Sequence, residues 1–138
     1  EVTEGQYSDY KIKSFKIEND KRKKQTVIDV VLEMPVSVSS IDIAIKNDFD
    51  YYRPVEVRAL VDSVKTQKGW HLNFKTLANG TLNSMEQNPL TFNSTILQRL
   101  QIIIQNNDNQ ALTIGKVKVK GYVYQLIARF TESGTYFL

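Results

Sequence analysis

The stretch Leu100–Tyr122, LQIIIQNNDNQALTIGKVKVKGY, contains two apolar runs separated by the five polar residues Asn106–Gln110. In the first run every second residue of Leu100–Ile104 is apolar, and in the second Val117 and Val119 alternate with lysines. β-Branched residues at a period of two predict strands. Asn and Asp favour a turn, because their side chains bond to their own backbone. The stretch therefore predicts two strands joined by a polar turn.

The same period of two recurs along most of the chain. Turn-forming residues separate the rows, and Asn79-Gly80 is the pair that most favours a two-residue hairpin turn. The phase shifts within Tyr10–Ile17, which predicts a β-bulge. With nine or ten short strands and no helical stripe, the sequence predicts an all-β, antiparallel β-sandwich, with residues 1–138 as one domain. The further alternating rows are Ile28–Met34, Ile41–Ile45, Val55–Val61, Trp70–Phe74 and Leu126–Phe130.

The residue types exclude several kinds of site. The chain has no cysteine, so it has no disulfide, thiolate zinc site or cysteine nucleophile. Its single histidine cannot form a metal cluster, and no phosphate-binding glycine loop or nucleophile elbow is present. Asp29, Glu56 and Asp62 fall at polar strand positions, which are typical of a solvated face rather than of a carboxylate pair across a cleft. We therefore expect no enzyme, no metal site and no cofactor.

Basic residues gather in two places, and the formal net charge of the chain is +3. Lys21–Lys24 is a basic run between two predicted strands, typical of a solvated hairpin tip. Lys116, Lys118 and Lys120 alternate with valines, as the solvent face of a strand does. No nucleic-acid-binding motif accompanies either group, so we do not expect a nucleic acid partner.

The order of segments is similar to that of a known fold. SSIDIAIKN (residues 39–47) is followed by DYYRPVEVRALVDS (50–63) and by GWHLNFKTL (69–77), a strand opened by tryptophan. ILQRLQIIIQNNDNQAL (96–112) and TIGKVKVKGY (113–122) come next. This order resembles galactose-binding-domain-like jelly rolls, the fold of discoidin domains and many carbohydrate-binding modules. The resemblance implies a jelly-roll β-sandwich whose ligands bind to loops at one end.

RLQIIIQNNDNQALTI (99–114) and the terminal GTYFL (134–138) also resemble an uncharacterised family of bacterial envelope proteins. That resemblance implies an exported protein of the periplasm or cell envelope. A membrane contact would then be made only by a segment outside the present chain, which we expect to be a domain of a longer protein. The implied partner is a glycan or another envelope protein.

Tyr51, Tyr52 and Arg53 are the first candidates for ligand contact. Tyrosine rings and a guanidinium combine flat faces with polar tips, which suits sugar rings and their hydroxyls. The alternative, which is the commoner arrangement, is that one tyrosine is buried and that Arg53 pairs with an aspartate of a neighbouring strand.

Four further candidates are Trp70, His71, Asn106 and Asp108. Trp70 heads an alternating apolar row, which favours a core position, and His71 faces the opposite side of the same strand. Asp108 and two aspartates of a second loop, Asp48 and Asp50, could share a calcium ion. Calcium takes six to eight oxygen ligands, and the few local carboxylates make a plain turn the preferred interpretation.

The sequence therefore predicts a non-catalytic domain that recognises a carbohydrate or a protein partner. The expected contact loops are those around Asn47–Arg53, Gln67–His71 and Asn106–Gln110. The alternative is a structural or assembly module that binds a protein partner and no small ligand. An open concavity at the two tyrosines would favour binding, whereas packed rings and a paired Arg53 would favour the structural role.

Overall fold

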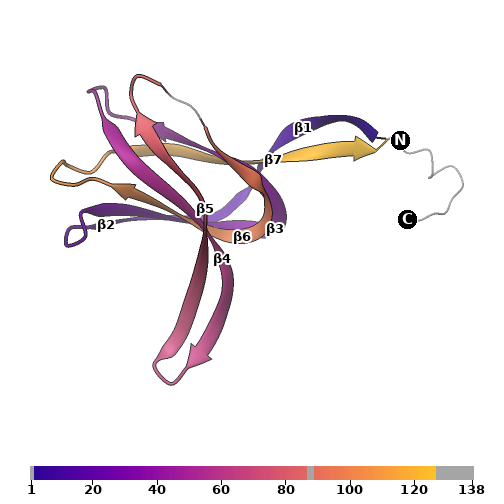
Figure 1. The fold of residues 1–138 in the computed structure, drawn as a ribbon, viewed down its shortest axis with the longest axis horizontal. Coiled ribbons are helices and arrows are strands. Elements are labelled where there is room, and N and C mark those ends of the chain that lie inside the picture. Colours follow the sequence, from indigo (N-terminus) through magenta and orange to yellow (C-terminus); the bar gives the residue numbers. More distant parts are fainter. Residues whose placement is uncertain (1, 87–88, 127–138) are drawn as a thin grey trace, which may run out of the picture.

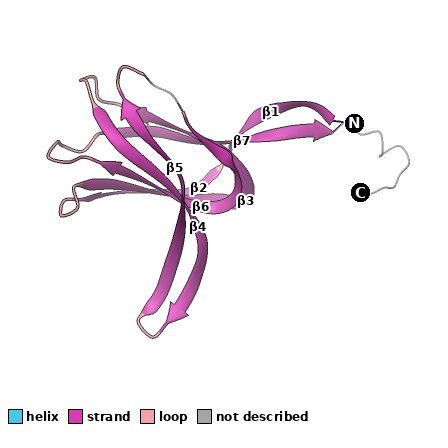
Figure 2. Cartoon of the chain, viewed as in Figure 1, coloured by secondary structure: helices cyan, strands magenta, loops and turns pink. Residues whose placement is uncertain are grey.

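Antiparallel strands form the described part of the chain, residues 2–86 and 89–126, in a computed structural model (Figure 1). Side-chain surroundings are described for residues 9–86 and 89–121. No described residue is helical (Figure 2), so this part of the chain offers no helix long enough to cross a membrane. The strands are β1 (Val2–Tyr10), β2 (Ile12–Asp20), β3 (Gln25–Ile45), β4 (Tyr52–Thr66), β5 (Gly69–Asn83), β6 (Leu90–Gln105) and β7 (Ile114–Leu126).

Strands β3 and β6 form the centre of the sheet and pair along most of their length. The first half of β3 also pairs with β2, and its second half pairs with β7, which in turn pairs with β1. Strand β4 lies between β6 and β5, and its contact with β6 covers Val55–Ala59. The order is β1-β7-β3-β6-β4-β5, with β2 beside β3. This hydrogen-bonded sheet bends across β3 and β6, so that its two halves face each other as a sandwich (Figure 1).

The bend lies where the β3–β6 register shifts, between Val31 and Val36. Met34 and Pro35 are exposed at this point. Proline cannot donate a ladder hydrogen bond, so its position in a bend costs less than in a regular strand. The predicted Ile28–Met34 row is wrong at its end for this reason: the strand continues through Pro35, and Met34 is exposed while Ile28 faces the core.

The core lies between the two halves of the sheet, and its residues come from alternating positions of the strands. Fully buried aliphatic side chains of this kind contribute about 1.5–3 kcal/mol each. The predicted rows from Ile28, Ile41, Val55 and Leu100 all face this core. Its largest fully buried side chains are Ile28, Leu32, Ile41, Leu100, Ile102 and Ile104.

The predicted hairpin turn at Asn79-Gly80 is wrong. These residues lie inside β5, where they pair with Glu56 and Val55. A Cβ on Gly80 would lie 2.7 Å from Cδ2 of Leu90, so the glycine makes room for a core side chain. Continuous strands at Asn79-Gly80 and at Pro35 explain why the described residues contain seven strands and not nine or ten.

Other local predictions are confirmed. The β2–β3 register shifts between Ile12 and Ser14, as the expected bulge requires. Val117 and Val119 are buried, whereas the alternating Lys116 and Lys118 are exposed and Lys120 is half-buried. Strand β7 ends at Leu126, so the rest of the predicted Leu126–Phe130 row and the GTYFL segment lie outside the described residues.

Beyond Ala59, β4 pairs only with β5 among the described strands, and the two strands form a ribbon that projects from the sandwich (Figure 1). Residues 61–71 are exposed throughout this ribbon, which we call the β4–β5 ribbon. Val61 and Trp70 therefore lie in solvent, although their alternating rows predicted core positions. Apolar and polar residues do alternate along these strands, but within the described residues no second layer covers the apolar face of the ribbon.

Candidate functional site

Four connections lie together at one end of the sandwich (Figure 1): β2–β3, β3–β4, β5–β6 and β6–β7. Hydrogen bonds join each loop to the next. The amide of Asn106 donates to the carbonyl of Lys24 at 2.9 Å, and the amide of Lys46 donates to the carbonyl of Thr113 at 2.9 Å. The amide of Tyr51 donates to Oγ of Ser84 at 3.0 Å. These bonds make the four loops one connected surface, which we call the loop end.

An open hollow of about 420 Å³ separates the β3–β4 and β5–β6 loops. We call it the tyrosine hollow, because the two tyrosines at its edge take different roles. Tyr51 is buried in the core, and its backbone bonds fix it to Ser84. Tyr52 presents its ring to solvent and is 66% exposed. The lining residues are Asp50, Tyr51, Tyr52, Asn83, Ser84 and Met85.

Tyr52 and Asn83 are directly opposite each other in the β4–β5 pairing, which brings the side chains of a cross-strand pair onto the same face. Oδ1 of Asn83 accepts the amide of Met85 at 2.9 Å, so the Asn83 amide is held in place while its NH₂ group remains available for further donation. Asp50 adds a carboxylate, which accepts hydrogen bonds when ionised. An aromatic face thus stands beside one donor and one acceptor group.

Arg53 has a different role from Tyr52. It is only 4% exposed, and its Nη1 donates to Oδ1 of Asn106 at 2.8 Å and to the carbonyl of Gln110 at 2.9 Å. Burial lowers the pKa of the Arg53 guanidinium from its usual value, because desolvation disfavours the charged form. The expected aspartate partner is wrong: among the described residues no carboxylate forms an ion pair with Arg53. Arg53 instead holds the β6–β7 loop in place.

The hydrogen-bond network continues from Asn106 across the loop end. Nδ2 of Asn106 donates to Oγ1 of Thr26 at 2.8 Å, and that hydroxyl donates to Oδ1 of Asn19 at 2.8 Å. Side chains from β4, the β6–β7 loop, β3 and β2 are therefore joined in series. Residue type and spacing did not point to Asn19 and Thr26 as part of the site, because the register of distant strands decides which polar side chains meet.

A second hollow, of about 460 Å³, lies between the β2–β3 and β6–β7 loops. We call it the basic hollow, since Lys21 and Lys24 are at its rim. The Asn106–Gln110 segment forms one wall, and it is a turn, as predicted: Asn107 has a left-handed φ of 55°. Asp108 pairs with Lys24, which lowers the pKa of the Asp108 carboxyl. The lining residues are Asn19, Asp20, Lys21, Lys24, Gln25, Asn106, Asn107, Asp108, Asn109, Gln110 and Ala111.

This geometry does not support a shared calcium site for Asp108 and Asp50. Asp108 lies in the basic hollow and Asp50 in the tyrosine hollow, so the two do not line a common hollow. No group of three or more metal-ligating side chains is present in the part of the chain that the structure describes.

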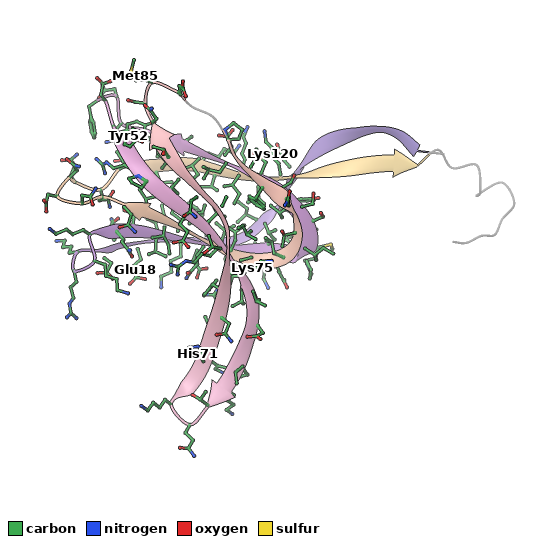
Figure 3. The ribbon with its side chains drawn as sticks, in the orientation of Figure 1. Glu18, Tyr52, His71, Lys75, Met85 and Lys120 are labelled. Atoms are coloured by element: carbon green, nitrogen blue, oxygen red, sulfur yellow. The ribbon has the colours of Figure 1, made fainter. Side chains whose placement is uncertain are left out.

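Trp70 and His71 do not belong to the loop end. They pair with Lys65 and Val64 near the tip of the β4–β5 ribbon. About 12 strand residues separate Tyr52 from this position, a distance of roughly 40 Å along an extended strand. Figure 3 shows Tyr52 and Met85 at the loop end and His71 on the ribbon. The prediction that Gln67–His71 shares a surface with the other two loops is therefore wrong, and the core position expected for Trp70 is wrong as well, since its ring is 66% exposed.

Three carboxylates considered for catalysis have polar partners on the strands. Asp29 binds Arg99 through two hydrogen bonds, Glu56 binds Arg58 and Thr76, and Asp62 accepts from Asn73. The bond from Arg58, followed by that from Thr76, lowers the pKa of Glu56. None of the three lines the tyrosine hollow or the basic hollow.

Comparison with known proteins supports the fold through a solved structure. No family model and no curated protein sequence matches the chain. The chain is similar to a structure described as the CBM32 of AlyQ in complex with 4,5-unsaturated mannuronic acid. The TM-score is 0.61 and the sequence identity is 14%, with 81% of this chain and 97% of the other chain covered. At this identity the likeness concerns the fold, and it agrees with the antiparallel strand order described above: the chain is a β-sandwich with the galactose-binding-domain-like jelly-roll fold.

Proposed function

We propose that this protein is a non-catalytic carbohydrate-binding domain whose loop end holds a glycan in the tyrosine hollow. The observation that carries the proposal is the exposed ring of Tyr52 beside the amide of Asn83 and the carboxylate of Asp50. Sugar rings present apolar C–H faces and hydroxyls that both donate and accept. An aromatic face with one donor and one acceptor beside it matches those groups.

The rigid surroundings of the ring support the same proposal. Tyr51 is packed into the core and bonded to Ser84, so the neighbouring Tyr52 starts from a fixed backbone. A backbone that is already ordered loses little conformational freedom when a ligand binds, which favours affinity. The solved structure of the same fold, which is described with a bound sugar, supports the proposal by analogy. A location in the bacterial periplasm or cell envelope is part of the proposal and rests on the sequence resemblance alone.

Two exposed aromatic residues allow a matched test. Tyr52 and Trp70 are both 66% exposed, but Tyr52 is at the loop end and Trp70 is near the tip of the β4–β5 ribbon. We expect Tyr52→Ala to abolish glycan binding and Trp70→Ala to leave it unchanged. Binding is measured by calorimetry and by chemical-shift perturbation against a panel of neutral and acidic oligosaccharides at high concentration. Retained binding in Tyr52→Ala together with loss in Trp70→Ala would contradict the loop-end site.

The β4–β5 ribbon favours a second candidate function, an assembly module that binds a protein partner. Val61, Val64 and Trp70 expose apolar surface on the ribbon, and exposed aromatic residues are common at protein interfaces. Under this function the oligosaccharide panel would give no binding to the wild type. Sedimentation velocity would instead show self-association that increases with concentration and that is absent in Trp70→Ala.

A further inference from the structure

We propose that the glycan bound at the loop end is acidic, and that its carboxylate or sulfate groups bind in the basic hollow. This inference rests on the proposed function and extends it, because it names the class of glycan and a second contact region. The basic hollow lies beside the tyrosine hollow: Arg53 follows Tyr52 in the chain and bonds to Gln110 in the wall of the basic hollow.

The charge of the chain is concentrated around the basic hollow. Lys21 and Lys24 line the hollow together with the acidic residues Asp20 and Asp108. Arg22 and Lys23 complete the same hairpin tip, and Arg53 lies behind the wall, bonded to Asn106 and Gln110. Five basic and two acidic residues give this region a formal net charge of +3, equal to the net charge of the whole chain. Within the loop end, the four consecutive basic residues Lys21–Lys24 at the edge of the basic hollow are where an anion is attracted.

Both acidic residues of this region are already engaged. Asp20 turns back to its own hairpin, where its Oδ1 accepts the amides of Arg22 and Lys23 at 3.0 and 3.1 Å. Asp108 pairs with Lys24. Among the described residues, no carboxylate is paired with Lys21, Arg22 or Lys23. Lys21 lines the hollow, and Arg22 and Lys23 are exposed beside it on the same hairpin tip, so all three are accessible to anionic groups of a ligand.

Beneath the wall of the hollow, Arg53 adds a buried positive charge. Its hydrogen-bond partners Asn106 and Gln110 are neutral, so the charge of the guanidinium is not compensated by an acid within the described residues. In a buried site a charge acts over a longer distance than at the surface, since it is screened less by solvent. An anion in the hollow would gain from this charge without direct contact.

The lining of the basic hollow favours a polysaccharide over a nucleic acid. Six of its residues carry side-chain amides, namely Asn19, Gln25, Asn106, Asn107, Asn109 and Gln110. Amides donate and accept, as hydroxyl-rich ligands require. Asn19 and Asn106 are engaged in the network with Arg53 and Thr26, so Gln25, Asn107, Asn109 and Gln110 are the amides that a ligand would meet. Single-stranded nucleic acids are bound through aromatic stacking platforms, and none of the described lining residues is aromatic.

The test compares polygalacturonate with its methyl-esterified form, which has the same sugar backbone with its carboxylates masked. The variant Lys21→Gln/Arg22→Gln/Lys23→Gln removes three charges from the hairpin tip. Its matched control, Lys116→Gln/Lys118→Gln/Lys120→Gln, removes three charges from the solvent side of β7. Both variants carry the same net charge, so a difference between them reports the position of the charges.

We expect the wild type to bind polygalacturonate more tightly than the esterified form, with an affinity that falls as salt is added. The hairpin variant should lose about tenfold or more in affinity for polygalacturonate, which corresponds to the loss of one charged hydrogen bond. The β7 variant should bind like the wild type. Equal binding of the two polymers, or equal losses in the two variants, would overturn the inference.

Failure of the inference is distinguishable from failure of the proposed function. If esterified and acidic polymers bind equally and Tyr52→Ala abolishes both, the loop end is a glycan site without charge selection. If neither polymer nor any oligosaccharide of the panel binds, the proposed function fails as well. An oligothymidylate that binds as tightly as polygalacturonate at the same salt concentration would show a nucleic-acid or unselective anion site and would also overturn the inference.

Discussion

Arg53 donates from Nη1 to Oδ1 of Asn106 across 2.8 Å, and the two residues are only 4% and 5% exposed. They are 53 positions apart in the chain, one in β4 and one at the start of the β6–β7 loop. This bond fixes the wall of the basic hollow to the strand that also presents Tyr52. The wall of the basic hollow therefore depends on a buried polar contact with β4.

Asn106→Ala should lower the free energy of unfolding by about 2–4 kcal/mol, because it leaves the buried Arg53 guanidinium with only the Gln110 carbonyl and removes the donor to the Thr26 hydroxyl. Urea denaturation measures the change. Asn109→Ala is the control in the same loop: Asn109 is exposed, and its amide bond to the Asn106 carbonyl does not need its side chain. Equal effects of the two substitutions would show that the Arg53–Asn106 bond contributes little.

Gly121→Ala should destabilise the β1–β7 pairing. A Cβ at this position would overlap the carbonyl oxygen of Ser37 and the phenol of Tyr10. We expect a loss of about 1–3 kcal/mol in chemical denaturation, as for other overpacked sites. Tyr10→Phe removes only the hydrogen bond to Ser37 and should cost about 1 kcal/mol. Adding Tyr10→Phe to Gly121→Ala should restore little stability, since the contact with Ser37 involves backbone; full recovery would argue that the phenol alone is the obstacle.

The low pKa of Glu56 predicts a pH dependence of stability. A carboxyl with a lowered pKa binds fewer protons in the folded state, so its stabilising effect is present above the unfolded pKa of about 4.3 and is lost as the pH falls through the folded value. Between about pH 5 and pH 3, the wild type should therefore lose up to about 1 kcal/mol more than Glu56→Gln. Glu33→Gln, at the exposed bend, should follow the wild-type profile in thermal denaturation. Parallel curves of stability against pH for the wild type and Glu56→Gln would show that Arg58 and Thr76 do not stabilise the ionised Glu56 carboxylate.

Backbone amides of the β4–β5 ribbon should exchange with solvent faster than those of Val55–Ala59 in the same strand. Within the described residues, the ribbon is a two-stranded element without a third strand or a covering layer, and such hairpins are marginally stable. Hydrogen exchange followed by mass spectrometry measures both segments in one experiment. Equal protection of the two segments would show that the ribbon is held by contacts that the strand pairing does not include.

Period-two alternation was sufficient to predict the all-β class and most of the core, because burial on one face of a strand leaves that pattern in the sequence. Rows such as Leu100–Ile104 are buried as expected. The same rule misplaced Trp70, since alternation shows that a strand has an apolar face but not that a second layer covers it. The hairpin turn predicted at Asn79-Gly80 was wrong for a related reason: the local turn preference of these two residues is weaker than the packing of Leu90 against the glycine.

The candidate site was predicted only in part. Tyr51, Tyr52 and Arg53 were identified from residue type, but their separation into a buried ring, an exposed ring and a buried cation depends on alternating orientation at the start of β4. Asn83 is opposite Tyr52 through the β4–β5 register, which the misplaced turn concealed. The partner of Arg53 likewise required the long-range pairing of β4 with β6, in which Val55 lies opposite Ile104.

The bend in β3 and β6 has a consequence for how the domain unfolds. In a sandwich of two separate sheets, one sheet can loosen while the other keeps its hydrogen bonds. Here the same two strands run through both halves of the sheet, and the core lies between those halves. Loosening either half would pull on strands that the other half needs, which favours a single cooperative transition. A glycan bound at the loop end would then protect the whole sandwich against unfolding, including the parts that it never touches.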